Sequence, residues 1–183
     1  MTLPNKLTIA RICMIPFMAL TLQAGLMESI ALPLDLARYI AAGIFILAAV
    51  TDFLDGHIAR KRNLFTDFGK FMDPLADKIL VMAAMVYMVL MGDISPLVLI
   101  LIESREFIIA GVRMVAANKN VVIAAGISGK VKTVVQMIMI PTVLIGLPHI
   151  VFDIIGQVLI YGAVVLTIIS AVDYIWNNRE VLK

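Results

Sequence analysis

Two uncharged runs long enough to cross a lipid bilayer constrain the fold of this chain more than any other feature of its sequence. They extend from Thr133 to Phe152 and from Ile154 to Val172. A spanning helix needs about 20 mostly apolar residues, and only helices or closed barrels satisfy every backbone hydrogen bond inside lipid. With 62% hydrophobic residues and a mean hydropathy of +1.02, the sequence disfavours a soluble bundle. We therefore expect an all-α integral membrane protein.

Shorter apolar segments extend this pattern to six transmembrane helices in a single domain that covers residues 1–183. The expected spans are Leu7–Leu26, Leu36–Arg60, Leu75–Met91, Pro96–Ala117, Lys130–Leu147 and Phe152–Trp176. Of the 15 Lys and Arg residues, all but Arg38 then fall on one side of the membrane. Because Lys and Arg collect on the cytoplasmic side of membrane proteins, both termini are expected in the cytoplasm.

Charge and cysteine content narrow the possible functions. The net charge of +2 is too small to indicate nucleic-acid binding. The single cysteine, Cys13, has no second cysteine in the chain to pair with, so no internal disulfide is expected. The N-terminal residues show no signal-peptide cleavage pattern, and we expect the first apolar segment to remain as a span.

The segment from Thr51 to Lys78 concentrates charge in this apolar chain. Two groups of its residues are at helical spacing: Asp52, Asp55, Gly56 and Ala59 in the first half, and Gly69, Asp73 and Asp77 in the second. Residues at spacings of three and four lie on one face of a helix. Two helices are therefore expected to present two carboxylates each to a common space, on the cytoplasmic side of the membrane.

Four carboxylates held together would repel one another unless a cation lies between them. Oxygen-only ligands suit Mg²⁺ or Mn²⁺, which keep positions open for phosphate oxygens. Two such metals about 3.5–4 Å apart could hold a pyrophosphate and stabilise the entering and leaving oxygens. The pattern thus favours phosphoryl-type transfer at the membrane surface.

A simpler interpretation is that these charges are solvated loop residues. We prefer it for Asp67, Lys61 and Arg62, but not for the four aspartates that are aligned on two helix faces. Asp73 has a further alternative, because Asp before Pro74 is also typical of a helix N-cap followed by the first helical residue. Asp73 is therefore expected to cap a helix, to bind metal, or to do both.

The same residues match a known family pattern. The pattern is D-x-x-D-G-x-x-A-R, eight residues, then G-x-x-x-D-x-x-x-D, met by Asp52, Asp55, Gly56, Ala59, Arg60, Gly69, Asp73 and Asp77. It resembles the signature of the CDP-alcohol phosphatidyltransferases, a family of six-span membrane enzymes. The resemblance implies that an alcohol attacks the phosphorus of CDP-diacylglycerol that bears the diacylglycerol, and that CMP leaves.

The resemblance also implies roles for individual residues. Asp52, Asp55, Asp73 and Asp77 are expected to bind two divalent metals, and Asp77 is also the expected general base. The expected CDP-lipid contacts are Asn5, Thr8, Gly56, Ala59, Arg60, Thr66 and Gly69. Of the two histidines, His57 lies at a variable motif position and His149 on the opposite side. We therefore expect direct in-line displacement rather than a covalent intermediate.

Cations outside the aspartate segment indicate the acceptor alcohol. Arg105, Arg113, Lys130 and Lys132 are expected on the cytoplasmic side, where they could bind a phosphate dianion such as that of glycerol 3-phosphate. The alternative is an ion pair with Glu103 or Glu106 for Arg105, and membrane anchoring for Arg113.

Short segments narrow the resemblance within the family. The stretches NKLTIARICMIPF, ESREFIIAGVR and GKVKT resemble the bacterial phosphatidylglycerophosphate synthases. This resemblance implies a multi-pass protein of a bacterial cell membrane, in contact with membrane lipid and assembled as a homodimer. Two alternatives stay open, a related enzyme that uses inositol phosphate or another alcohol and a divalent-cation transporter.

Overall fold

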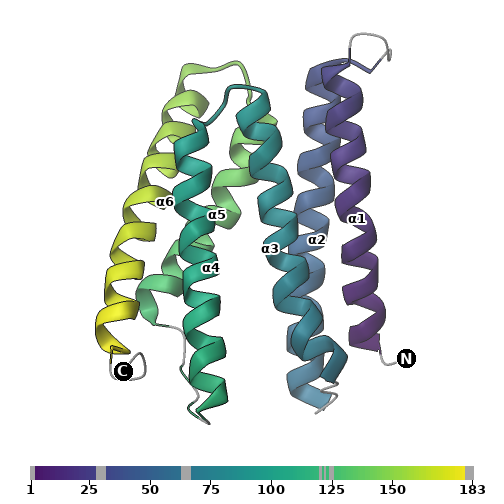
Figure 1. Ribbon diagram of the computed structural model, residues 1–183. Helices are drawn as coiled ribbons and strands as arrows, with labels where there is room; N and C mark the ends of the chain where they lie inside the picture. The colour runs from purple at the N-terminus through teal and green to yellow at the C-terminus, as the bar shows by residue number, and fades with distance from the viewer. Residues whose placement is uncertain are drawn as a thin grey trace.

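The computed structural model describes residues 3–27, 32–62, 67–119, 121, 123 and 126–179, with the backbone alone at residues 3–6, 54–62 and 67–71. Over these residues the regular structure is entirely α-helical. The helices are α1 (Leu3–Leu26), α2 (Leu34–Arg62), α3 (Asp67–Leu90), α4 (Pro96–Asn118), α5 (Ile127–Ile145) and α6 (Ile150–Asn177). They alternate in direction. The start of α1 and the ends of α2, α4 and α6 therefore lie at the same end of the molecule (Figure 1).

Local sequence explains several helix boundaries. The Ser95 side chain accepts a hydrogen bond from the backbone N–H of Val98, and Pro96 occupies the first helical position of α4, where its missing N–H costs nothing. Helix α5 ends at Gly146, whose φ of +49° is a conformation that glycine adopts readily. Each segment predicted as a span lies on its own helix.

Helix α3 begins earlier than the predicted third span, at Asp67 rather than Leu75, and it continues through Pro74. Asp73 therefore lies inside the helix, and the N-cap interpretation of this residue is wrong. The consequence for the site is that Gly69, Asp73 and Asp77 occupy one face of a single continuous helix.

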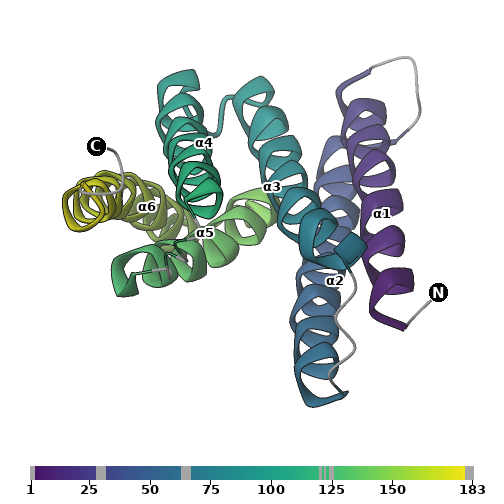
Figure 2. The same cartoon turned by 60° about the horizontal axis from the view of Figure 1, so that its bottom comes forward.

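The six helices form two neighbouring groups of three. Helices α1, α2 and α3 pack together, α5 and α4 each pack against α6, and the groups meet where α3 contacts α4 and where α5 contacts α2 and α3 (Figure 2). A shared core fills the centre, and its fully buried members include Met18, Leu22, Phe45, Leu80, Met85 and Met139. Helices α2, α3 and α5, which carry most of the predicted site, are thus held around one core.

Within the described ranges, four helices are long and apolar enough to cross a membrane: α1 over Leu7–Leu26, α2 over Leu34–Phe53, α5 and α6. Helices α3 and α4 carry more charge, including Asp73, Asp77, Glu103 and Arg105. The outer surface exposes large apolar side chains such as Phe17, Phe53, Phe107, Met114 and Trp176. Such a surface is what a lipid environment requires, and the structure is that of a membrane protein.

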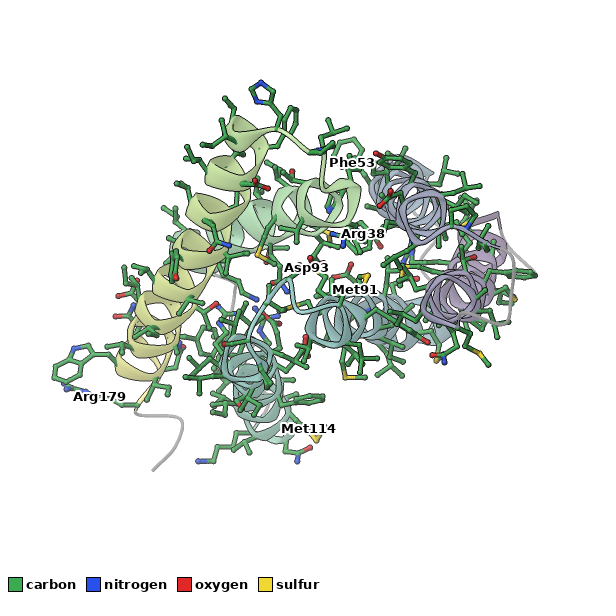
Figure 3. The ribbon with its side chains drawn as sticks, turned by 90° about the horizontal axis from the view of Figure 1, so that it is seen from above. Arg38, Phe53, Met91, Asp93, Met114 and Arg179 are labelled. Atoms are coloured by element: carbon green, nitrogen blue, oxygen red, sulfur yellow. The ribbon has the colours of Figure 1, made fainter. Side chains whose placement is uncertain are left out.

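The end of the molecule opposite the aspartates is held together by Arg38 of α2. Its guanidinium donates to the carbonyl oxygens of Leu144 at 3.0 Å and Val143 at 2.8 Å, and forms an ion pair with Asp93 at 2.9 Å. Arg38 and Asp93 lie between the helices in the view from this end (Figure 3). A side chain at position 146 would lie 2.9 Å from this guanidinium, so the glycine there also makes room for Arg38.

Candidate active site

Helix α1 supplies two buried polar groups that contact the predicted metal ligands. The hydroxyl of Thr8 donates a hydrogen bond to Oδ1 of Asp73 on α3. Arg11 forms an ion pair with Asp52 on α2, with 2.7 Å between the guanidinium nitrogen and Oδ1. Both α1 side chains are fully buried. Because their spacing of three places them on one helix face, α1 fixes a carboxylate on each of the two motif helices.

Asp77 lies on the same face of α3 as Asp73, one helical turn further along. It is within electrostatic range of both Asp52 and Arg11. Asp52 on α2 and Asp77 on α3 are therefore near enough for their charges to interact, and Asp73 shares a helix face with Asp77. Convergence of all the predicted carboxylates at one point stays a prediction. The positive charge of Arg11 offsets part of their mutual repulsion.

Several predicted residues lie outside what the structure describes. These are all of Thr66, the side chains of Asn5, Asp55, Ala59 and Arg60, and the surroundings of Gly56 and Gly69. The backbone does show that Asp55, Gly56 and Ala59 belong to α2 and Gly69 to α3, so the helical spacing assumed for them is present.

The donor set fits a divalent cation. Among the side chains that are described, no three Asp, Glu, His or Cys residues are arranged as a complete metal site, and Asp55 is not among those side chains. Asp52, Asp73 and Asp77 offer only carboxylate oxygens, from two facing helices, and Arg11 neutralises one of the three charges. Hard cations such as Mg²⁺ prefer this chemistry.

Asp77 also lines a small polar cavity of about 30 Å³ between α3, α4 and α5. The other residues in its wall are Lys78, Val81, Glu103, Glu106, Thr133, Gln136 and Met137. The cavity thus connects the predicted general base with a group of charged residues from two other helices.

Three cations meet at Glu106 beside this cavity. Lys132 Nζ and an Arg105 guanidinium nitrogen each lie 2.8 Å from Glu106 Oε1, and Lys78 Nζ lies 3.9 Å from Oε2. Lys132 also donates to Oε1 of Gln136, and it is 1% exposed. The predicted ion pair between Arg105 and Glu106 is present, and it is part of a larger cluster rather than an isolated pair.

The Arg105 side chain is fixed from two other helices. Its Nε donates to the hydroxyl oxygen of Ser170 on α6 at 3.1 Å, and that hydroxyl donates in turn to the carbonyl oxygen of Thr167. A Cβ atom at Gly129 on α5 would lie 3.0 Å from an Arg105 guanidinium nitrogen. The absence of a side chain at position 129 therefore lets the guanidinium lie against the backbone of α5.

The other two predicted acceptor cations lie apart from this cluster. Arg113 donates to the hydroxyl of Tyr174 at 3.2 Å and lies over the Tyr174 ring, 5.7 Å from its centre. It follows Arg105 by eight residues on α4, which is about 12 Å along the helix axis. Lys130 is exposed at the beginning of α5. The structure therefore brings Arg105 and Lys132 together, and places Arg113 and Lys130 nearer the end of the bundle.

A second, larger groove of about 430 Å³ runs between α2 and α5. Its wall is mainly apolar, with Phe45, Val50 and Phe53 from α2, and Asp52 is its one charged residue. Thr133 and Met137 of α5 line both this groove and the polar cavity at Asp77. An apolar groove and a polar cavity thus share a wall between two of the predicted metal ligands.

The sequence did not single out Arg11, Lys78, Gln136 or Ser170. Arg11 could have been found from the sequence, because a charged residue within an apolar span is energetically costly unless it has a partner. Gln136 carried a weaker signal, since it lies one helical turn after Lys132. Ser170 and Lys78 had none, because their contacts depend on how α3, α4 and α6 are placed relative to one another.

The molecule exposes an apolar surface suited to lipid, carries neighbouring carboxylates on two helices, and has a polar cavity beside an apolar groove. These features are typical of one class of protein, the membrane enzymes that act on phosphorylated compounds. Comparison with known sequences identifies the family within this class. The family model of the CDP-alcohol phosphatidyltransferases matches residues 1–169, and the chain belongs to this family. The predicted family is confirmed, and the finding favours an enzyme over a cation transporter.

Named relatives extend over almost the whole chain. A CDP-diacylglycerol–glycerol-3-phosphate 3-phosphatidyltransferase of Bacillus subtilis is 40% identical, over 99% of this chain and 97% of that protein. The protein of the same name from Rickettsia bellii is 38% identical, over 94% of this chain and 92% of its own length. A probable phosphatidylglycerophosphate synthase of Mycobacterium tuberculosis is 35% identical, over 94% of this chain and 79% of that protein.

Proposed function

We propose that this protein transfers the phosphatidyl group of CDP-diacylglycerol to sn-glycerol 3-phosphate, giving phosphatidylglycerophosphate and CMP. The observation that carries the proposal is the wall of Thr133 and Met137 shared by the apolar groove and the polar cavity. This reaction needs a lipid donor and a water-soluble acceptor to meet at one set of carboxylates. Asp52 on the groove side and Asp77 on the cavity side meet that need, and the names of the relatives supply the substrates.

The donor lipid occupies the α2–α5 groove, with an acyl chain along Phe45, Val50 and Phe53 and its pyrophosphate toward Asp52. The residues carried over from the family pattern for the CDP portion are Asn5, Thr8, Gly56, Ala59, Arg60, Thr66 and Gly69. Of these, Thr8 has a described contact that supports its place, because it donates to Asp73. Thr8 and Arg11 orient Asp73 and Asp52.

The acceptor enters the polar cavity with its phosphate toward Arg105 and Lys132 and a free hydroxyl toward Asp77. Asp77 takes the hydroxyl proton, because an alcohol is a weak nucleophile until it loses that proton. The alcohol oxygen then forms a bond to the phosphorus that bears the diacylglycerol. The bond from that phosphorus to the CMP oxygen breaks in line, and CMP leaves with the electron pair.

Asp52, Asp55, Asp73 and Asp77 would hold the divalent metals, two Mg²⁺ or Mn²⁺ ions by the family resemblance. Bound metal would supply positive charge to the pyrophosphate oxygens as the bond to CMP breaks. Treatment of the purified protein with EDTA should abolish CMP release, and added Mg²⁺ or Mn²⁺ should restore it. Full activity after exhaustive chelation would contradict this part of the proposal.

The membrane arrangement is part of the same proposal. All six helices span a bacterial cell membrane, both termini lie in the cytoplasm, and the active site faces the cytoplasm. Support comes from α2, whose 29 residues extend roughly 43 Å and so exceed a hydrocarbon core of about 30 Å. The charged end of α2 can thus reach the aqueous interface. A homodimer rests on the family resemblance, and cross-linking in native membranes would test it.

An acceptor screen tests the function directly. Purified protein in detergent with CDP-diacylglycerol and Mg²⁺ is given glycerol 3-phosphate, inositol phosphate, serine or free glycerol, and CMP is measured. We expect release with glycerol 3-phosphate alone. Release with inositol phosphate or serine in its place would reject the acceptor, and no release with any acceptor would reject the transfer reaction.

A further inference from the structure

Glu106 has an unusual position for a residue in a cluster that is proposed to bind an anion. Its carboxylate lies in the place where the cations converge, 2.8 Å from Lys132 and 2.8 Å from Arg105 through the same oxygen. Lys78 approaches its other oxygen at 3.9 Å and donates to its backbone carbonyl at 3.1 Å. A carboxylate in this position has the charge and the acceptor oxygens that a phosphate group would bring.

The Glu106 carboxylate blocks the cations that it contacts. Its Oε1 lies 2.8 Å from both Lys132 Nζ and an Arg105 guanidinium nitrogen, so an acceptor phosphate oxygen cannot take that position while Glu106 stays in place. Glu106 must therefore move before an acceptor phosphate can contact both cations there.

Glu106 has more freedom to move than either Arg105 or Lys132. Arg105 is held by Ser170 and by the backbone at Gly129, and Lys132 is 1% exposed and bonded to Gln136. The Glu106 side chain is 20% exposed, and its described carboxylate contacts are with the cations alone. A dianion that binds these cations could replace the carboxylate without leaving any of them unpaired.

We propose that the Glu106 carboxylate occupies the phosphate position of the acceptor site and that only a phosphorylated acceptor displaces it. This inference rests on the proposed function and adds a basis for its selectivity. A neutral alcohol cannot compensate Lys132 and Arg105, so Glu106 keeps its place between the two cations. An acceptor with a phosphate compensates both cations, which offsets the loss of the internal ion pairs.

Binding of inorganic phosphate to the intact purified protein tests the proposal without turnover. The variant Glu106→Gln removes the charge and keeps the shape. We expect it to bind inorganic phosphate at least tenfold more tightly than the unmodified protein by isothermal titration calorimetry, because the internal competitor is lost. Asp153→Asn removes a negative charge at the opposite end of the bundle and is expected to leave phosphate affinity unchanged.

Unchanged or weaker phosphate binding by Glu106→Gln would overturn the proposal, because it would mean that Glu106 positions the cations instead. If that variant does not give a single species on gel filtration, Glu106→Asp replaces it. The shorter acid pulls back from the cations, so phosphate should bind several-fold more tightly, and no gain would again overturn the proposal. The acceptor screen tests the proposed function separately. If Glu106→Gln binds phosphate more tightly but the protein releases no CMP with any acceptor, the proposed function is rejected while the proposed anion site is supported.

Discussion

At the scale of single residues, the carboxylates of the site are of two kinds: some form an ion pair with a basic side chain, and others have no such described pair. Asp52 has Arg11 and Glu106 has Lys132 and Arg105. Asp77 has no described salt bridge, and it lines the polar cavity and interacts electrostatically with Asp52, another predicted metal ligand. A carboxylate without a fixed cation is the one suited to accept a proton from the substrate.

Asp77→Asn should therefore lower kcat by roughly 100-fold to 10,000-fold, the usual contribution of a general base. Binding of CDP-diacylglycerol should remain measurable, because Asp52 and Asp73 are unchanged. CMP release and equilibrium binding of the donor are the two measurements. Asp67→Asn, at the first residue of the same helix, is the matched control and should keep nearly full activity. A kcat within a few-fold of normal for Asp77→Asn would exclude it as the essential base.

Gly129→Ala should weaken acceptor binding. The added methyl group would lie 3.0 Å from the Arg105 guanidinium and push it away from Lys132. We expect the KM for glycerol 3-phosphate to rise roughly tenfold, equivalent to about 1.4 kcal/mol, while the KM for CDP-diacylglycerol stays constant. Gly111→Ala on α4 is the control, because a Cβ there meets nothing within 4 Å. Equal KM values for the two variants would show that Arg105 does not need this close approach.

At the scale of helices, the sequence predicts those features that depend on the periodic spacing of apolar and charged residues. The apolar segments located all six helices, and spacing placed Asp73 and Asp77 on one helix face. The start of α3 was not predicted, because Pro74 is a helix breaker by local preference and tertiary contacts override that preference here. The pairing of Arg11 with Asp52 depends on the packing of α1 against α2, which periodicity does not encode.

Arg38 shows how one side chain can connect three elements. It caps the last carbonyls of α5, pairs with Asp93 in the α3–α4 connection and belongs to α2. Arg38 also explains why one basic residue lies at the end that the other basic residues avoid. Its contacts there are structural.

Arg38→Ala should destabilise the fold without reducing catalysis at the far end of the bundle. Loss of charged hydrogen bonds of this kind costs about 2–3 kcal/mol for a side chain that is 16% exposed. In a chain of this length the melting temperature should fall by roughly 5–10 °C. Thermal unfolding in detergent measures the shift, and Arg179→Ala, an exposed residue over the Trp176 ring, is the control. If the Arg38→Ala variant has the same melting temperature as the control, the α5 carbonyls need no such cap.

At the scale of the whole molecule, the two ends of the bundle differ in charge and in chemistry. Over the described residues, one end carries the aspartate motif, the start of α1, the end of α6 and the cation cluster, and Arg38 is the only basic residue described at the other end. Such asymmetry orients a membrane protein, because Lys and Arg are retained in the cytoplasm. Under the proposed function, the end with the aspartate motif faces the cytoplasm.

Cysteine labelling in cells tests this orientation. In a Cys13→Ser background, Ser95→Cys lies in the α3–α4 connection and Asn177→Cys at the end of α6, and both positions are exposed. A membrane-impermeant maleimide should label position 95 in intact cells and position 177 only in inside-out vesicles. The reverse pattern would place the aspartate motif outside the cell and contradict the proposed orientation. Labelling of both positions from the same side would mean that an even number of spans separates them, and therefore that α4, α5 and α6 do not all cross the membrane.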